Sequence, residues 1–517
     1  MRAVAAVLLA LLACACARKL QPPNVLLVTV DTLRADHVGS YGYARDTTPN
    51  LDALAAEGLR FTRAGSPRAK TTPAMASLLS GTYPHEHGVR DLASPLAPEL
   101  PLFAESLRRA GYGTGALVGN WVLGDARSGL ARGFELWSEW LPDTVGVPPH
   151  DAPQRGARSL TDGALVALGL AEPPDDPAFE PRRALVREGR PWFLWLHYMD
   201  PHGAYDPPQE TRVFASDAVE RLPEIDESEV SRAQPPHVPR VADYNIPPEA
   251  RLEDGGVDVA RVRDLYDGEI RYVDRELGRL VDALRAAGLL DDTLLVVTAD
   301  HGESLGEHRY WFEHGMYAYE TTCRVPLIVR TPRRAGEAAP QGVRGGEISL
   351  VDLAPTILDL LDLPPLPGAP PELREAPRGR SRRALLDSDQ PASAPIFCEK
   401  VERAERAGVV QSKAVRLGDW KLIRRYAARD DPAHRSQREL VLLSEELFDL
   451  AADPLEATNL AGAPPAAAPL DSLRRELERF TRADFELVDL DRILQRQRER
   501  LEHGDPEVLR TLEALGY

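Results

Sequence analysis

Three nearly continuous hydrophobic runs along the chain lead into polar residues that can bind a metal or move a proton. The first spans Val25 to Val30, the second spans Leu294 to Val297, and the third is in PWFLWLHYMDPHG. Their polar followers are Asp31 after the first, Asp300 and His301 after the second, and His197, Asp200 and His202 in the third. A hydrophobic run of this length with a polar end is typical of a buried parallel strand.

Segments with helical periodicity separate these runs. One is TTPNLDALAAEG, at residues 47–58, and a longer one covers residues 262–288. The longer segment repeats hydrophobic residues at helical spacing, at Leu265, Ile270, Val273, Leu277, Leu280, Val281 and Leu284. The alternation predicts an α/β fold with a mostly parallel central sheet flanked by helices. In such sheets ligands bind beyond the carboxyl ends of the strands, where we expect the polar residues to meet.

Stretches rich in proline, glycine or charged residues mark the expected domain boundaries. We expect a signal peptide over 1–23, a catalytic domain over 24–365, a Pro- and Arg-rich linker over 366–384, a small C-terminal α+β subdomain over 385–469, and a helical tail over 470–517. Strand-like runs in KAVRLGDWKLIRRY and ELVLLSEELFDL predict a small antiparallel sheet in the subdomain.

The first residues have the pattern of an export signal. Met1 and Arg2 precede a hydrophobic run that is too short to span a bilayer comfortably. The run ends in Leu-Leu-Ala-Cys14, which resembles the lipobox of bacterial lipoproteins, whose cysteine is acylated. We expect an exported protein of the cell envelope that is attached to the membrane only by this lipid. A plain cleaved signal peptide is the alternative.

The net charge and the number of cysteines limit which partners and cross-links we expect. The formal net charge of −18 would repel the phosphate backbone, so we expect no nucleic-acid partner. Beyond the signal, Cys323 and Cys398 are the remaining cysteines, and the sequence leaves open whether they pair.

Asp31, Asp300 and His301 together favour a divalent cation, because carboxylate and imidazole are common metal ligands. A single aspartate after a strand would more often be a helix cap or a turn residue. Two such strand ends make a metal site the better interpretation.

A series of motifs then resembles the sulfatase family of the alkaline phosphatase superfamily. They are, in chain order, NVLLVTVDTLRADHVGSYGY, TTPAMASLLSGTYPHEHGV, WLHYMDPHGAY, TADHGESLGEH, RVPLIVRTP, VDLAPTILDLL and LFDLAADPLEATNL. The resemblance covers nearly the whole chain after the signal. It implies hydrolysis of a small-molecule, glycan or lipid ester.

The chain departs from that family at the reactive positions. Sulfatases carry C-x-P-x-R, whose cysteine or serine becomes formylglycine, and the matching residues here are Thr71 to Met75. Threonine cannot become formylglycine. The lysine and histidine of the family's G-K-W-H-L-G correspond to Asn120 and Val122, and its second metal-binding aspartate corresponds to Thr32. These departures indicate either a change of chemistry or a loss of activity.

The resemblance to phosphoryl-transferring branches of the superfamily implies Thr71 as a metal-activated nucleophile. The expected ligands are Asp31, Asp300, His301 and the Thr71 oxygen. An added imidazole and fewer carboxylates favour zinc or manganese, while calcium or magnesium is also possible.

His202 and His314 are the other predicted catalytic residues. In the family the histidine at the His202 position reaches the charged oxygens of the substrate, and His314 stands where a lysine is frequent. His314 would bind those oxygens or protonate the leaving group. Alternatively, Asp200, His202 and His314 would hold a second metal. We expect structural roles for three further histidines, His85, His87 and His308.

Three functions are therefore open. The first is a metal-dependent hydrolase or transferase of phosphate or sulfate esters with phosphoryl chemistry favoured, the second is a sulfatase without formylglycine, and the third is a non-catalytic surface lipoprotein on a decayed scaffold.

The lipid-anchor hypothesis has a direct test. Cys14→Ser removes the sulfur that would be acylated, so the variant should move from the membrane fraction to the soluble fraction. Fractionation followed by immunoblotting measures this, and unchanged membrane association would refute the anchor.

Overall fold

The computed structural model describes residues 22–92, 94–139, 155–175, 179–187, 189–225, 239–333, 339–367, 378–388, 394–404, 408–430, 438–463 and 467–487. Residues 1–21 of the expected signal peptide, which include Cys14, and the last thirty residues of the predicted tail lie outside these ranges. Among the helices of the described residues, none combines the length and hydrophobicity that a membrane span requires.

An eight-stranded sheet forms the centre of the molecule. Its strand order is β11-β2-β10-β7-β1-β5-β3-β4. The strands are β1 (Asn24–Val30), β2 (Leu59–Gly65), β3 (Gly113–Val118), β4 (Leu136–Ser138), β5 (Trp192–Tyr198), β7 (Thr293–Ala299), β10 (Arg324–Arg330) and β11 (Gly342–Ser349). Only β10 runs antiparallel to its neighbours, β2 and β7. The predicted α/β fold with a mostly parallel sheet is confirmed.

The three hydrophobic runs form β1, β7 and β5, which are adjacent strands of the parallel part. Strand β1 pairs in parallel with β7 on one side and with β5 on the other. From Val25 to Val30, every side chain of β1 is buried. Burial on both faces explains why these strands read as continuous hydrophobic runs instead of alternating patterns.

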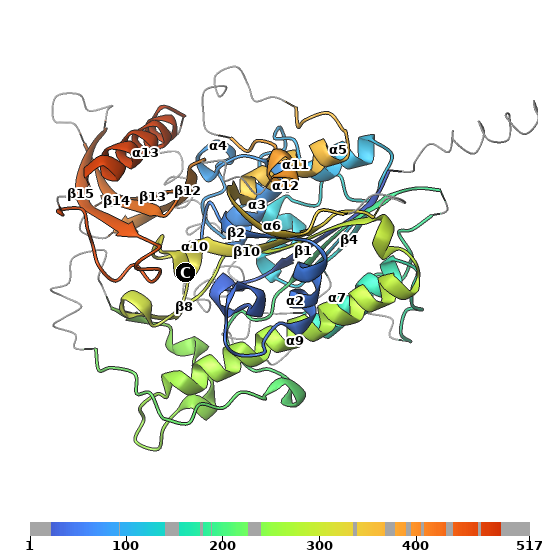
Figure 1. The fold of residues 1–517 in the computed structure, drawn as a ribbon, viewed down its shortest axis with the longest axis horizontal. Coiled ribbons are helices and arrows are strands. Elements are labelled where there is room, and N and C mark those ends of the chain that lie inside the picture. The colour runs from blue at the N-terminus through green and yellow to red at the C-terminus, as the bar shows by residue number, and fades with distance from the viewer. Residues whose placement is uncertain are drawn as a thin grey trace, which may run out of the picture.

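Helices cover both faces of the sheet (Figure 1). On one face lie α2 (Pro49–Glu57), α7 (Ala157–Ala167) and α9 (Val259–Ala286), and on the other lie α3 (Thr71–Ser80), α5 (Phe103–Arg109) and α11 (Leu353–Leu360). All seven hydrophobic residues predicted to form one face of α9 are buried. The Asp258 side chain caps this helix by accepting a hydrogen bond from the Ala260 amide.

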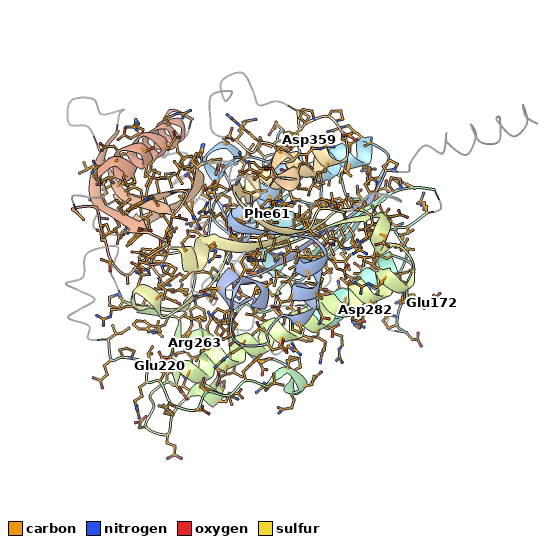
Figure 2. All side chains as sticks on the ribbon, viewed as in Figure 1. Phe61, Glu172, Glu220, Arg263, Asp282 and Asp359 are labelled. Atoms are coloured by element: carbon orange, nitrogen blue, oxygen red, sulfur yellow. The ribbon has the colours of Figure 1, made fainter. Side chains whose placement is uncertain are left out.

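A second, antiparallel sheet follows in the order β12-β13-β14-β15, as predicted. Its strands are β12 (Ile396–Ala404), β13 (Gly408–Leu417), β14 (Trp420–Asp430) and β15 (Arg438–Asp449), and α13 (Ala467–Leu487) packs on it. A short third sheet contains β6 (Arg240–Val241), β8 (Ser304–Leu305) and β9 (Tyr310–Glu313). Figure 2 shows Phe61 of β2 in the interior and Asp282, Glu220 and Arg263 towards the periphery.

A buried ionic cluster joins the second sheet to the catalytic domain. The Glu399 carboxylate of β12 accepts hydrogen bonds from Lys413 Nζ at 2.6 Å and from Arg90 Nη1 at 3.1 Å. Lys413 is completely buried, and Glu399 is 2% exposed. Because a buried charge that loses its partner is costly, this cluster favours one arrangement of the two sheets.

Candidate active site

Four neighbouring strands deliver polar side chains to the same edge of the central sheet. Asp31 follows β1, Asp300 follows β7, His197 is the sixth residue of β5, and Asn120 lies two residues beyond β3. The register pairs the last residue of β1 with the last residue of β7, which sets the two aspartates side by side. This is the carboxyl edge at which α/β sheets bind ligands.

Thr71 reaches this edge from the first turn of α3. Lys70, with extended backbone, caps the helix, and Thr71 is the first helical residue. Its Oγ1 lies 3.4 Å from Asp31 Oδ2 and 3.5 Å from His301 Nε2. Thr71 is 2% exposed. A helix N-terminus favours negative charge, so this hydroxyl lies where an anion or an alkoxide is stabilised.

Two buried carboxylates lie at the centre of the site. Asp31 and Asp300 are both fully buried. Burial and the negative charge of Asp31 raise the pKa of Asp300 well above its usual range. Among the described residues, Asp31 Oδ1, Asp300 Oδ2 and His197 Nε2 are buried polar atoms without a hydrogen-bond partner. Such atoms need a partner, and a cation held between them would supply it.

These residues fit a divalent cation. Each of Asp31, His197 and Asp300 offers a ligand atom, and the three atoms lie within 4.8 Å of one another. The two carboxylates match the charge of the ion, and a neutral imidazole is a common metal ligand. Sequence reasoning had not assigned His197, because it lies inside an apolar strand instead of after it. The sequence feature that could have indicated its role is a single histidine within the otherwise hydrophobic run WFLWLHY.

His301 presents its Nε2 to the same centre. Its Nδ1 lies 2.9 Å from the Gly302 carbonyl oxygen, so Nδ1 carries the proton and donates it. Nε2 lies 3.3 Å from Asp300 Oδ2 and 3.8 Å from Asp31 Oδ1. Burial and the neighbouring His314 lower the pKa of His301 well below its usual range. A neutral ring with a free Nε2 lone pair is the form that binds metals.

The two other predicted catalytic histidines stand next to His301. The ring centroids of His301 and His314 are 4.3 Å apart, and those of His314 and His202 are 5.1 Å apart. His314 Nδ1 lies 3.3 Å from an oxygen of buried Glu303, which orients the ring. Burial raises the pKa of Glu303 to about 8. Sequence reasoning did not single out Glu303, which belongs to the DHGE motif.

Asp200 has other partners than these histidines, and within the described part of the chain Asp200, His202 and His314 do not form a group that could hold a second metal. Its Oδ2 accepts a hydrogen bond of 2.9 Å from the Ala157 amide at the start of α7. It also interacts with buried Glu269, and burial raises its pKa to about 6. Asp200 is therefore a helix-capping carboxyl group, and the interpretation of Asp200, His202 and His314 as one ligand set is wrong.

Asn120 has a role that the sequence comparison with sulfatases did not suggest. Its Nδ2 donates a hydrogen bond of 2.7 Å to Asp31 Oδ2. Its Oδ1 accepts one of 3.0 Å from the Val122 amide, which fixes the side chain. The residue that replaces the family's lysine thus orients a metal-ligand candidate.

The histidines expected to be structural lie outside this group. His87 Nε2 lies 2.9 Å from the Ser77 hydroxyl, His85 Nδ1 lies 3.6 Å from Glu399, and His308 stacks on Tyr319 with centroids 3.5 Å apart.

The chain is similar to known proteins along most of its length. The family model described as sulfatase matches residues 23–363, and the model described as N-sulphoglucosamine sulphohydrolase, C-terminal, matches residues 306–483. Choline-sulfatase of Rhizobium meliloti (strain 1021) is 30% identical over 90% of this chain and 88% of that protein. The multifunctional alkaline phosphatase superfamily protein PehA of Trinickia caryophylli is 28% identical over 86% and 92%.

Solved structures show the same fold. The structure of BT4656 in complex with D-glucosamine-2-N,6-O-disulfate has a TM-score of 0.65 at 23% identity, and covers 91% of this chain and 99% of that one. Phosphonate monoester hydrolase of Agrobacterium radiobacter has a TM-score of 0.61 at 24% identity, and covers 89% and 96%.

The non-catalytic alternative is set aside, because the relatives are ester hydrolases and the reactive side chains meet at one point. By the match to its family model and by its relatives, the chain belongs to the sulfatase family of metal-dependent ester hydrolases.

Proposed function

We propose that the protein hydrolyses phosphate or sulfate esters with a divalent cation and with Thr71 as the nucleophile, phosphate esters being favoured. The observation that carries this proposal is the position of Thr71 Oγ1. It lies at the start of a helix, 3.4 Å from one metal-ligand candidate and 3.5 Å from another.

Asp31, Asp300 and His301 would hold the cation, together with His197. When bound, the cation supplies positive charge for the ester oxygens and lowers the pKa of a neighbouring hydroxyl group. Asn120 keeps the Asp31 carboxylate oriented through its 2.7 Å hydrogen bond. His197 Nδ1 lies 2.8 Å from the Thr29 hydroxyl, which holds the ring so that Nε2 faces the carboxylates.

Thr71 attacks the central atom of the ester, and the N-terminus of α3 stabilises the negative charge on its oxygen. His314, whose Nδ1 lies 3.3 Å from a Glu303 oxygen, would bind the charged oxygens of the ester or protonate the leaving group, and His202 beside it would bind the remaining oxygens. The product of this half-reaction is an ester of Thr71, which a water molecule then cleaves.

The identity of the nucleophile favours phosphorus over sulfur. A formylglycine hydrate releases sulfate by collapsing to the aldehyde, and a threonine ester lacks this route. Its release needs a second in-line attack, which suits phosphoryl transfer. The similarity to PehA, which is named a multifunctional alkaline phosphatase superfamily protein, supports the same choice.

Sulfate ester hydrolysis by the unmodified Thr71 is the second candidate. The 30% identity with choline-sulfatase favours it. Membrane attachment through Cys14 stays a prediction alongside both candidates.

A three-substrate comparison separates the candidates. On one manganese- or zinc-loaded sample, we expect p-nitrophenyl phosphate or bis-p-nitrophenyl phosphate to have a higher kcat/KM than p-nitrophenyl sulfate. The Thr71→Ala protein, treated identically, gives the background. A higher kcat/KM for the sulfate would favour the second candidate over the first.

The nucleophile is tested by substitution at Thr71. Thr71→Ala removes the attacking oxygen and should lower kcat by about three orders of magnitude or more, as removal of a nucleophile does elsewhere. Thr71→Ser keeps an oxygen and should retain part of the activity. Thr72→Ala is the matched control, because Thr72 is buried on the same turn but donates its hydroxyl to the Val122 carbonyl.

If Thr71 only stabilises the start of the helix, its alanine variant would lose about 1 kcal/mol of stability. It would then keep normal turnover. That result would refute the nucleophile assignment.

Metal binding is tested at Asp300. Asp300→Asn removes one of the two negative charges that would balance the cation, so metal occupancy and rate should both fall. Elemental analysis after dialysis measures occupancy. Asp200→Asn is the matched control, since Asp200 is buried nearby but caps α7, and this variant should keep its metal. Full occupancy in Asp300→Asn would contradict the ligand assignment.

A further inference from the structure

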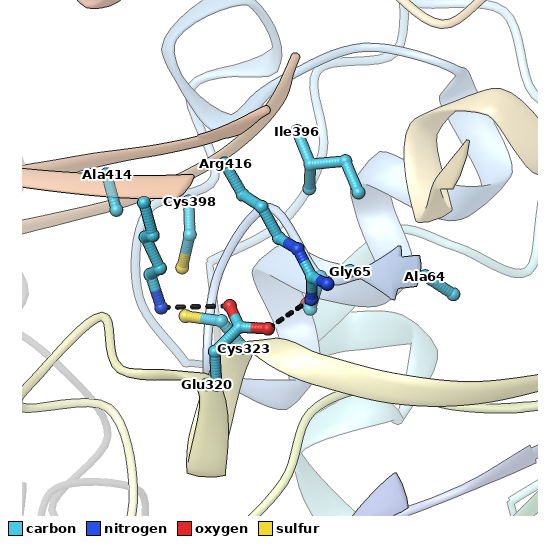
Figure 3. Close-up of a pocket in the computed structure, with 10 residues that line it drawn as sticks. Ala64, Gly65, Glu320, Cys323, Ile396, Cys398, Ala414 and Arg416 are labelled. Carbon is cyan, nitrogen blue, oxygen red and sulfur yellow. Dashed lines mark hydrogen bonds and ion pairs between the residues drawn. The ribbon is translucent and has the colours of Figure 1, made fainter. Parts of the chain in front are cut away.

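Two cysteines lie against each other at the seam between the two large sheets. Cys323 ends α10 (Glu320–Cys323) and leads directly into β10 of the central sheet, while Cys398 lies in β12 of the second sheet. They are 4% and 5% exposed. The structure holds both as free thiols. Figure 3 shows the two sulfur atoms next to each other.

The same two strands hold the segment that leads into the nucleophile helix. The Ser66 amide donates a 2.7 Å hydrogen bond to the Cys323 carbonyl. On the other side, the Glu399 amide, next to Cys398, donates a 2.9 Å hydrogen bond to the Pro67 carbonyl. Residues 66–67 are thus bracketed by the backbones on which the two cysteines lie, only a few residues before Thr71.

The Arg68 guanidinium adds further hydrogen bonds to this segment. Its Nη1 donates to the Glu399 carbonyl at 3.2 Å and to the Gly315 carbonyl at 3.3 Å. Gly315 follows His314. The position of β12 relative to β10 therefore affects the approaches to both Thr71 and His314.

A small cavity lies beside the thiols (Figure 3). Both cysteines line it, together with Glu320, Arg416 and Lys421. Lys421 Nζ lies 3.0 Å from Glu320 Oε1, and Arg416 pairs with the other oxygen of the same carboxylate. The charged groups are thus paired with one another, and the cavity gives the two sulfur atoms room to adjust.

We propose that Cys323 and Cys398 form a disulfide bond when the protein folds in an oxidising compartment. The contact of the two side chains meets the requirement that disulfide partners already be close. The bond would covalently join the catalytic domain to the second sheet and fix the bracket around residues 66–67. This inference does not depend on the proposed reaction.

The oxidant is a disulfide of an exported oxidoreductase or of glutathione. One cysteine thiolate attacks this disulfide, forms a mixed disulfide and displaces one donor thiol. The other cysteine then attacks the mixed disulfide, which forms the Cys323–Cys398 bond and releases the second donor thiol. Two electrons and two protons pass to the donor.

The exchange takes place before the seam closes. Burial raises the pKa of the Cys323 thiol in the folded protein, and a protonated, buried thiol is a poor nucleophile. Once formed, the bond is equally protected from reductants. It is therefore a permanent cross-link, and it closes a loop between positions 75 residues apart (398 − 323).

Peptide mapping tests the bond. The full chain is folded in a glutathione redox buffer, its free thiols are alkylated in denaturant, and it is digested with trypsin without reduction. We expect residues 310–324 linked to residues 384–400, with the linked mass falling apart on reduction. Recovery of both peptides carrying the alkyl label would overturn the proposal.

Thermal stability gives an independent readout. Cys323→Ala, Cys398→Ala and the double variant should lose the same several degrees of Tm, because each removes the same cross-link. Wild-type protein folded with reductant should match them, whereas the variants should not respond to reductant. Cys14 and Cys16 are unchanged in the variants, so any response to reductant that comes from these two cysteines would appear in wild type and variants alike.

The two cysteines would be free thiols that only pack against their neighbours if the Tm losses of the single variants added up in the double variant and the wild type did not respond to reductant. That outcome would also overturn the proposal. Neither readout uses ester hydrolysis, so a failure here is distinguishable from a failure of the proposed function.

Discussion

Two carboxylates, Asp31 and Asp300, are buried side by side where parallel strands end, and the remainder of the site is arranged around them. Removing one carboxylate from water is costly, and placing a second beside it adds repulsion. Neither carboxylate has an arginine or lysine partner among the hydrogen bonds and ion pairs described for it. Their neighbours are imidazoles, an amide and a hydroxyl. A divalent cation is the ligand that such a set stabilises best.

The fold holds these buried side chains in place. The parallel register of β7, β1 and β5 fixes Asp300, Asp31 and His197 on backbone that is hydrogen-bonded on both sides. Helix α3 brings Thr71 to them from the other direction, with its positive end first. Since Asp31, His197 and Asp300 stand at strand ends and Thr71 stands at a helix start, regular secondary structure preorganises these four side chains.

Sequence reasoning predicted the sheet class because buried parallel strands leave uninterrupted hydrophobic runs, and three of these runs became β1, β5 and β7. It named Asp31, Asp300 and His301, since polar residues after such runs converge by topology, while Thr71 was named from the resemblance to the sulfatase family. It assigned no metal-binding role to His197, because this residue lies within a hydrophobic strand. It also did not predict the hydrogen bond from Asn120 to Asp31, because these residues are far apart in the sequence. It grouped Asp200 with the histidines because a sequence does not show which way a side chain turns after a strand.

The claim that the buried carboxylate pair is a metal centre is tested most directly by anomalous diffraction. Crystals of the manganese-loaded protein would be measured on both sides of the manganese absorption edge. The account predicts one anomalous peak within bonding distance of Asp31, Asp300 and His301. A fully loaded crystal with no peak there, or with its peak only at another place, would contradict it.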